Sequence, residues 1–275
     1  MIHTFKHRAM ATEFQVRLAS EEAGYAAQVA QVAFAETDRL ENLLSRFREN
    51  SDICAAAQLQ PGETLRLSEP TFACLEIAHD MEAATAGAFS PTPTALKTQG
   101  AIPRWSLDRN NFSVKCESGR LEFDLGAIGK GFALDRMAAE LAEWSCPAYM
   151  LVAGGSSILV GGAPPGEPGW RVRLGDTDAG PCHWLAGCSL SGSGTAVKGR
   201  HIFDPRSGEP AARLSRVWAL APGAAVSDAL STACMVLGEP EIKTTVAGQG
   251  DWLVWLQDGA VWRHFGGREL PARVE

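Results

Sequence analysis

The most constraining feature of the chain is one continuous segment, Phe123 to Asp135, with the sequence FDLGAIGKGFALD. Alternating apolar residues predict a strand over residues 121–125, and apolar residues at helical spacing predict a helix from about residue 129 to 144. The glycines between them permit a tight turn. A strand that passes through such a turn into a helix requires a fold with both a sheet and covering helices.

The same segment offers a place for an anion. Free backbone N–H groups and the positive end of the helix dipole meet at the turn, and Lys130 lies in the first helical turn. The glycine spacing matches neither the dinucleotide fingerprint G-x-G-x-x-G nor a Walker A loop. A tight turn with a solvated lysine explains these residues as well as a phosphate site does, so both interpretations stay open at this point.

Strands and helices alternate along the rest of the chain. Further helices are predicted at residues 21–47, 68–87 and 227–237. Strands are predicted at residues 12–19, 112–115, 149–153, 157–160, 170–174, 217–220, 252–257 and 260–264, with a hairpin turn at Asp258 and Gly259. Because the sequence contains no internal repeat and no clean linker, we expect residues 1–275 to form a single compact domain. Its fold class would be α/β, of the mixed α+β kind, with sheets flanked by helices.

Composition narrows the function classes. The chain has 275 residues, 45% of them hydrophobic, and a formal net charge of −7. Its lysines and arginines are scattered, so we expect no nucleic-acid partner. No apolar run approaches the roughly 20 residues of a membrane span, and the first residues lack the apolar core of a secretory signal, so we expect no membrane span and a cytoplasmic location. The seven cysteines never form C-x-x-C, which predicts reduced, mostly buried thiols.

A second chemical pattern lies in the segment 227–233. Asp228 and Thr232 are one helical turn apart, which places a carboxylate and a hydroxyl on the same helix face. Hard oxygen ligands of this kind suit Mg²⁺, which takes few protein ligands and completes its shell with water and substrate phosphate. The structural alternative is that Ser227 or Asp228 caps the helix and that Thr232 bonds back to its own helix.

A third pattern begins at His201 and continues through a turn built from Asp204, Pro205 and Gly208. A histidine in this place could act as a general base or as a hydrogen-bond donor to phosphate, or it could be purely structural. The sequence contains no G-x-S-x-G elbow, which excludes an α/β-hydrolase-type serine enzyme. The other histidines have no metal-ligand spacing to one another: His3, His7, His79, His183 and His264.

Together, in this order, the segments resemble the signature of the FAD:protein FMN transferase (ApbE-like) family. The resemblance covers most of the chain, and it is the resemblance expected of a divergent member of the family. The matching stretches are residues 9–12, 45–48 with 51–53, 124–135, Gly154 with Gly155, 201–208, and 227–233. They are similar to the family patterns M-G-T, S-R-F/Y, D-L-G-x-I-A-K-G-x-x-x-D, N-x-G-G, H-I-x-D-P-x-T-G and A-D-A-L-A-T-A.

The resemblance implies the family's own α/β fold and its activity. Such an enzyme binds FAD and Mg²⁺, transfers FMN from FAD to a Ser or Thr hydroxyl of an acceptor protein, and releases AMP. The implied metal ligands are Asp228, Thr232 and the backbone carbonyl of Ala127, and the implied catalytic residues are Lys130 and His201. The implied FAD-binding residues are Met10, Phe47, Gly126, Lys130, Asp135, Gly154, Gly155 and His201.

The chain departs from the family pattern at several polar positions. Ser90 replaces the acid of F-D-P-T, and Ala153-Gly154-Gly155-Ser156-Ser157 stands where the family has N-x-G-G-D. Alanines at 55–57 stand where an Asn follows the segment 51–53. Each lost hydrogen bond could weaken ligand binding by about 1–3 kcal/mol. The departures motivate two alternatives, a non-catalytic FAD-binding homologue and an FAD pyrophosphatase that yields FMN and AMP.

Overall fold

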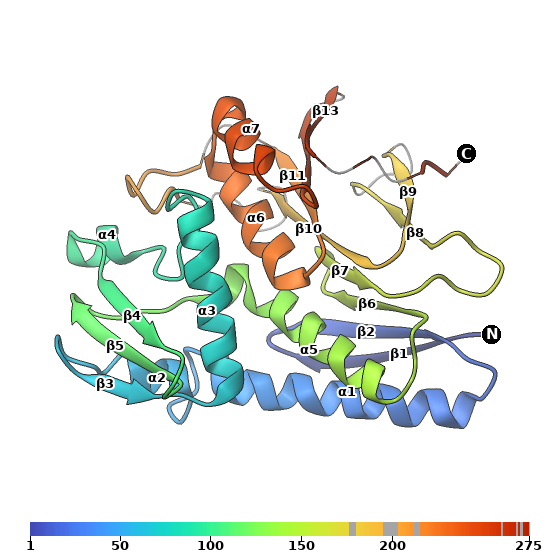
Figure 1. The fold of residues 1–275 in the computed structure, drawn as a ribbon, viewed down its shortest axis with the longest axis horizontal. Helices are drawn as coiled ribbons and strands as arrows, with labels where there is room; N and C mark the ends of the chain where they lie inside the picture. The colour runs from blue at the N-terminus through green and yellow to red at the C-terminus, as the bar shows by residue number, and fades with distance from the viewer. Residues whose placement is uncertain are drawn as a thin grey trace.

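An eight-stranded sheet organises the residues that the computed structural model describes, which are 1–175, 180–194, 203–211, 215–259, 261–267, 269 and 272–274. Its strand order is β1-β2-β6-β7-β10-β11-β12-β13, and each neighbouring pair is antiparallel (Figure 1). The strands are β1 (Ile2–Ala9), β2 (Thr12–Ala19), β6 (Tyr149–Ala153), β7 (Ser157–Val160), β10 (Cys188–Gly194), β11 (Arg216–Ala221), β12 (Leu253–Asp258) and β13 (Val261–Gly266).

Helices cover one face of this sheet. Helix α1 packs along β1 and β2, α5 along β6 and β7, and α6 along β10 and β11 (Figure 1). The helices are α1 (Ala23–Leu44), α2 (Asp52–Ala56), α3 (Glu69–Ala84), α4 (Ala95–Gln99), α5 (Gly129–Glu143), α6 (Ala224–Val236) and α7 (Glu239–Ala247), and a short 3₁₀ helix, η1 (Leu125–Ala127), precedes α5.

Two smaller sheets complete the described architecture. Strands β3 (Thr64–Arg66), β5 (Ser113–Ser118) and β4 (Arg104–Asp108) form a three-stranded antiparallel sheet next to α3 (Figure 1). Strands β8 (Trp170–Arg173) and β9 (Cys182–Leu185) form a ribbon. Apolar side chains of the ribbon pack with those of the large sheet's second face, so the sheet is covered on both sides there.

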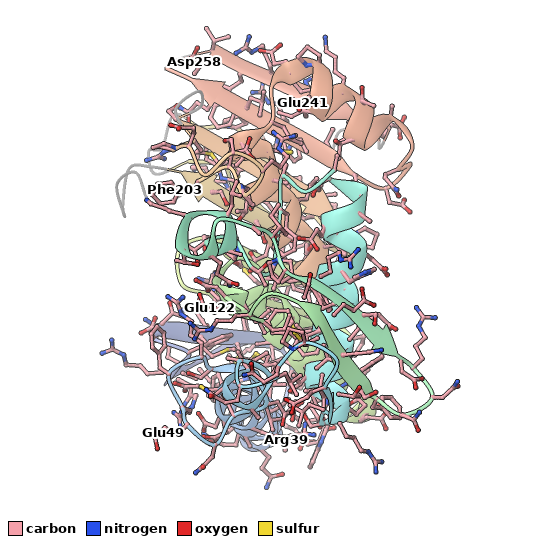
Figure 2. All side chains as sticks on the ribbon, turned by 90° about the vertical axis from the view of Figure 1, so that its left-hand side faces the viewer. Arg39, Glu49, Glu122, Phe203, Glu241 and Asp258 are labelled. Carbon is pink, nitrogen blue, oxygen red and sulfur yellow. The ribbon has the colours of Figure 1, made fainter. Side chains whose placement is uncertain are left out.

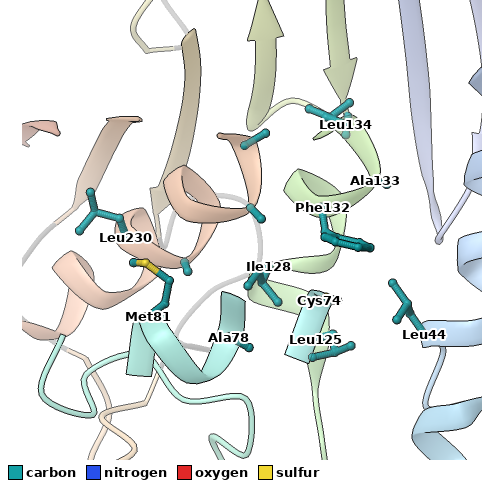
Figure 3. Close-up of a cluster of buried hydrophobic side chains, with 14 of the residues drawn as sticks. Leu44, Cys74, Ala78, Met81, Leu125, Ile128, Phe132, Ala133, Leu134 and Leu230 are labelled. Atoms are coloured by element: carbon teal, nitrogen blue, oxygen red, sulfur yellow. The ribbon is translucent and has the colours of Figure 1, made fainter. Parts of the chain in front are cut away.

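Side chains alternate between the two faces of the sheet, as the period of a strand requires. In β11, Val217 and Ala219 belong to the cluster under the helices, whereas Trp218 and Leu220 belong to the cluster under the ribbon. Helices α3, α5 and α6 meet over the first of these clusters (Figure 3). Its labelled members are Leu44, Cys74, Ala78, Met81, Leu125, Ile128, Phe132, Ala133, Leu134 and Leu230.

Most of the predicted elements are confirmed. The strand predicted at residues 12–19 has those bounds, and the strands at 149–153 and 157–160 also match. The predicted strands 112–115, 170–174, 217–220, 252–257 and 260–264 match β5, β8, β11, β12 and β13 with shifted ends. Strand β12 pairs with β13 as far as Asp258 and Val261, which confirms the hairpin. Its turn was predicted one residue too early, because Asp258 belongs to β12. All seven cysteines are free, and four of them are buried.

The strand predicted at residues 121–125 is wrong. Leu121, Phe123 and Leu125 are buried, as the alternation indicated, but this stretch pairs with no strand in the described part of the chain. Instead the amide of Asp124 donates to the carbonyl of Pro91 at 2.7 Å, and the chain then turns into η1. The alternation of apolar residues therefore predicted burial correctly, but it wrongly implied that a neighbouring strand pairs with this segment.

Two predicted helix ends are also wrong. Helix α6 begins at Ala224 and not at Ser227, because its cap comes from a carboxylate far away in sequence. Helix α1 ends at Leu44, so Phe47 lies outside it and is 81% exposed. Strand β1 was not predicted, and neither were α7 and β10.

The described helices include none that is both long enough and apolar enough to cross a lipid bilayer.

Candidate functional site

The candidate site lies where the N-terminal turn of α5 meets the beginning of α6. The two helices approach each other closely at Gly131, where an added Cβ would lie 2.0 Å from the carbonyl oxygen of Ala224. Only glycine permits that approach without a shift of one helix. The close contact brings the backbone N–H of Gly131 within 2.8 Å of the Asp228 side chain, to which it donates.

The Asp228 carboxylate is the most constrained polar group of this junction. It is 4% exposed and accepts three hydrogen bonds from described residues. Its Oδ2 atom accepts from the Gly131 N–H and from the Lys130 ammonium at 3.3 Å, and its Oδ1 atom accepts from the Ser157 hydroxyl at 2.6 Å. Asp228 therefore lies within the second turn of α6 and does not cap it, and the proposed capping role of Asp228 is wrong.

Asp135 of α5 caps α6 instead. Its two carboxylate oxygens accept from the N–H groups of Ala224 and Ala225 at 2.7 and 2.8 Å. This satisfies two of the amides that a helix N-terminus leaves without partners. Burial, opposed by the two N–H donors and reinforced by the charge of Asp228, raises the pKa of Asp135 from 3.8 to about 6. Asp135 is thus a structural carboxylate beside the site, and its assignment to FAD binding stays a prediction.

The raised pKa of Asp135 makes a measurable prediction. The folded protein holds this proton more tightly than the unfolded chain, so wild type loses stability as pH rises from about 4 to about 6, by roughly 2 kcal/mol. Asp135→Asn does not titrate there and lacks this loss. Denaturant unfolding of both proteins across that range should show the stability of wild type falling relative to the variant. Parallel curves would contradict the assignment of the raised pKa to Asp135.

Serines of β10 hold the inner face of α6. The Ser189 hydroxyl lies within 3.0 Å of the carbonyl oxygens of Ala221 and Gly223 and of the Ser227 hydroxyl, and the hydroxyls of Ser191 and Ser227 lie 2.8 Å apart. Ser227 therefore anchors α6 to the sheet, and its predicted role as the helix cap is wrong.

Thr232 lies one turn further along α6 than Asp228, and its hydroxyl also faces β10. The hydroxyl of Thr232 lies 3.4 Å from that of Ser193, which places Thr232 on the same face of α6 as Asp228, as its spacing predicts. The hydrogen bond of Thr232 is to the sheet, so the structural alternative of a bond back to its own helix receives no support.

The junction offers oxygen donors of the kind that magnesium prefers. No group of three or more His, Cys, Asp or Glu side chains suited to a metal occurs among the residues described. The candidate donors are instead one carboxylate, one hydroxyl and one backbone carbonyl, from Asp228, Thr232 and Ala127, and η1 with Ala127 packs against α6. This all-oxygen set suits Mg²⁺, and three accepted hydrogen bonds leave Asp228 one of its roughly four lone-pair positions.

The turn before α5 is fixed by its own aspartate. Asp124 accepts from the Gly126 N–H at 2.9 Å and pairs with the Arg46 guanidinium at 3.0 Å. Gly126 itself is exposed. The Arg46 guanidinium also lies over the Phe47 ring, 4.8 Å from its centre. The loop that carries the exposed Phe47 is therefore tied to the glycine turn, a connection that the sequence did not reveal.

Met10 reaches the start of α5 from the turn between β1 and β2. Both Met10 and Ala11 adopt positive φ, of 49° and 57°, in this two-residue turn. The Met10 methyl carbon lies 3.8 Å from the position that a Cβ on Gly129 would take. Met10 thus belongs to the same region as the glycine turn, and its role in FAD binding stays a prediction.

Gly154 and Gly155 form the turn between β6 and β7. Gly154 has a φ of 61°, and a Cβ there would lie 2.7 Å from the Thr12 hydroxyl oxygen. Gly155 is exposed and has open space where a side chain would be. The turn leads directly into Ser157, the hydrogen-bond donor to Asp228. It therefore borders the junction, and the role of its two glycines in FAD binding stays a prediction.

His201 lies outside the described residues, so its predicted catalytic role is not tested. The segment that follows is held firmly. Arg206 pairs with Asp204 at 2.8 Å and with Glu241 of α7 at 3.1 Å, and its aliphatic stem packs near Gly87. In the view of Figure 2, Phe203 lies below Glu241 and above Glu122.

Two of the positions that depart from the family pattern, Ser90 and Ala153, are buried. Ser90 is 6% exposed, and its hydroxyl lies 3.3 Å from that of Thr92. Ala153 is fully buried in β6, and Ser156 is partly exposed, with its hydroxyl 3.4 Å from that of Ser157. Burial raises the pKa of the Glu82 carboxyl, and the nearby Ser90 hydroxyl opposes that rise.

Comparison with known proteins identifies the family. Residues 10–253 match the model of the ApbE family. The chain belongs to the ApbE family. A protein named FAD:protein FMN transferase from Rhodobacter capsulatus is 30% identical over 194 residues, and one of the same name from Haemophilus influenzae is 26% identical over 253 residues. These alignments cover 64% and 80% of this ApbE-family chain, but the chain spans 35% and 72% of the two relatives.

Solved structures confirm the fold. A variant of the flavin transferase ApbE from Vibrio cholerae superposes with a TM-score of 0.81 at 18% identity, over 97% of both chains. The ApbE protein of Thermotoga maritima gives a TM-score of 0.81 at 22% identity, over 96% of this chain and 97% of that one. The predicted mixed α/β class and its ApbE-like fold are therefore both confirmed.

Proposed function

We propose that this ApbE-family chain transfers FMN from FAD to a Ser or Thr hydroxyl of an acceptor protein and releases AMP. Support comes from the curated relatives named for FAD:protein FMN transfer. The observation that carries the proposal is the buried Asp228 carboxylate, held at the N-terminal turn of α5 beside Lys130. Pyrophosphate cleavage concentrates negative charge, which Lys130 and the positive end of the α5 dipole can offset. Asp228 contributes by holding a cation beside them.

Asp228, Thr232 and the carbonyl of Ala127 are the residues that would hold Mg²⁺ in this proposal. The ion, when bound, would offset the charge of the pyrophosphate. Lys130, which is 26% exposed, pairs with Asp228 in the structure and can turn its ammonium toward a phosphate. The dipole at the start of α5 favours the same anion.

Contacts to the rest of FAD would come from the surrounding loops. The exposed Phe47 ring supplies an aromatic surface for the flavin or the adenine, and Met10 a flexible apolar one. Gly126 and Gly155, both exposed, allow the ligand to approach the backbone. His201 would take the proton from the incoming hydroxyl or assist the leaving phosphate, as the family resemblance implies.

The same proposal extends to the organisation of the chain. Strands β1 and β13 come from near the two ends of the sequence and form the two edges of one sheet. Such a sheet is completed only when both ends are in place. This supports the interpretation of residues 1–275 as a single domain.

Product analysis tests the activity and separates it from its alternatives. The purified chain is incubated with FAD, with and without Mg²⁺, and with a pool of synthetic peptides that each carry one Ser or Thr. We expect AMP that depends on Mg²⁺, together with peptide that has gained FMN. Equal amounts of AMP and free FMN would indicate a pyrophosphatase, the alternative that needs no acceptor. Bound FAD without any AMP would indicate the non-catalytic homologue that the departures at Ser90, Ala153 and Ser156 motivate.

A further inference from the structure

Ser157 is a fully buried polar residue of the large sheet. Its side chain is fully buried at the start of β7, and the strand continues with Ile158, Leu159 and Val160. A buried hydroxyl costs free energy unless it is hydrogen-bonded. The Ser157 hydroxyl donates to Oδ1 of Asp228 at 2.6 Å. Among the described residues its other polar contact is a longer one, 3.4 Å from the Ser156 hydroxyl.

The backbone around Ser157 leaves its hydroxyl little freedom. Ser157 pairs with Ala153 of β6 on one side and with Ser191 of β10 on the other, so it is anchored in a central strand. The preceding residue, Ser156, accepts a hydrogen bond from the Gly192 amide at 2.7 Å. A donor mounted on a strand that is fixed from both sides is a rigid reference point for any group it contacts.

Asp228 is thereby held between two elements. Ser157 of β7 fixes Oδ1, whereas the Gly131 amide of α5 fixes Oδ2. Oriented donors that bond a metal-binding side chain set its orientation and its affinity for the ion. Lys130 bonds Oδ2 as well, but from a flexible side chain that is partly exposed and free to move to a ligand.

We propose that Ser157 is a positioning residue that orients the Asp228 carboxylate for a divalent cation. This inference rests on the proposed function, which makes Asp228 a magnesium ligand. Ser157 touches neither the proposed substrate nor the ion, and it acts through Asp228. It also links the glycine turn at residues 154–155, on the proposed FAD side, to the metal side of the site.

The test is the binding of Mg²⁺ alone to the purified full chain, measured by titration calorimetry without FAD. Ser157→Ala removes the hydroxyl with little change in volume, and we expect roughly 10–100-fold weaker Mg²⁺ binding. The Mg²⁺ concentration for half-maximal AMP release should rise by a similar factor, whereas the affinity for FAD changes little. Ser157→Thr, which keeps a hydroxyl, should restore much of the Mg²⁺ affinity.

Ser189→Ala is the matched control. Ser189 is also fully buried and bonds the beginning of α6, but it does not contact Asp228. Both alanine variants should lower the melting temperature, and only Ser157→Ala should weaken Mg²⁺ binding. Equal Mg²⁺ affinity in wild type and Ser157→Ala, or an equal loss in both alanine variants, would overturn the positioning role. A wild type that neither binds Mg²⁺ nor releases AMP would instead refute the proposed function, and the role of Ser157 with it.

Discussion

Asp228→Asn should lower the rate of AMP release from FAD by at least about 100-fold, because it removes the one carboxylate among the proposed metal ligands. The amide keeps the size of the carboxylate and one oxygen that can accept from Ser157 or Gly131. It cannot balance the charge of a divalent cation. Steady-state assays at saturating FAD over a series of Mg²⁺ concentrations measure the effect.

The asparagine is chosen over alanine for a structural reason. Asp228→Ala would leave the buried Ser157 hydroxyl and the Gly131 amide without an acceptor and would destabilise the protein by several kcal/mol. A loss of activity would then have two causes. Thermal unfolding of Asp228→Asn should remain cooperative and near that of wild type. If a well-folded Asp228→Asn protein keeps the wild-type rate, Asp228 is not a metal ligand.

Gly131→Ala should destabilise the fold by about 3 kcal/mol. The added methyl group would lie 2.0 Å from the carbonyl oxygen of Ala224, and a backbone atom cannot move aside as a side-chain tip can. The helices α5 and α6 must then separate, which also lengthens the hydrogen bond from Gly131 to Asp228. We expect a large loss in the free energy of unfolding, measured in denaturant, and a loss of Mg²⁺ binding.

Gly129→Ala provides the comparison within the same helix. A Cβ at Gly129 would meet the Leu125 and Met10 side chains at 3.8 Å, an ordinary contact distance. Its stability should stay within about 1 kcal/mol of wild type. Equal destabilisation by the two alanines would mean that helix propensity or the turn before α5 decides stability, and that the approach of α5 to α6 does not.

Much of the fold could be predicted because its strands and helices follow local apolar periods. The strand at residues 12–19 and the helix that starts at Gly129 show this clearly. The predicted strand at 121–125 failed because Leu121, Phe123 and Leu125 alternate toward a core without a neighbouring strand to pair with. Which strands pair depends on the whole sheet, so the alternation of apolar residues within one segment does not reveal a pairing partner.

The start of α6 could not be predicted for a related reason. Helix-capping rules look for a cap among the adjacent residues, but here the cap is Asp135, a residue of another helix. The two helices must first be packed for that cap to exist. The same rules predicted a capping role for Ser227, whose hydroxyl bonds β10.

The site was predicted in part. The spacing of Asp228 and Thr232 correctly placed them on one helix face, and the glycine segment correctly placed Lys130 in the first turn of α5. That Lys130 pairs with Asp228 came from the structure. Ser157 and the Arg46–Asp124 ion pair were missed. A signal for Ser157 did exist, since it shares its strand face with the buried Leu159, and a serine there requires a buried partner.

The central claim is transfer, and the most direct test is the ratio of two products in one reaction. The chain is incubated with FAD, Mg²⁺ and the Ser/Thr peptide pool, AMP is quantified by chromatography, and flavin covalently bound to peptide is quantified by mass spectrometry. Transfer predicts one peptide-bound FMN for each AMP released, with both products lost in Asp228→Asn. AMP without peptide-bound flavin, or no AMP from a protein that binds FAD, would contradict the claim.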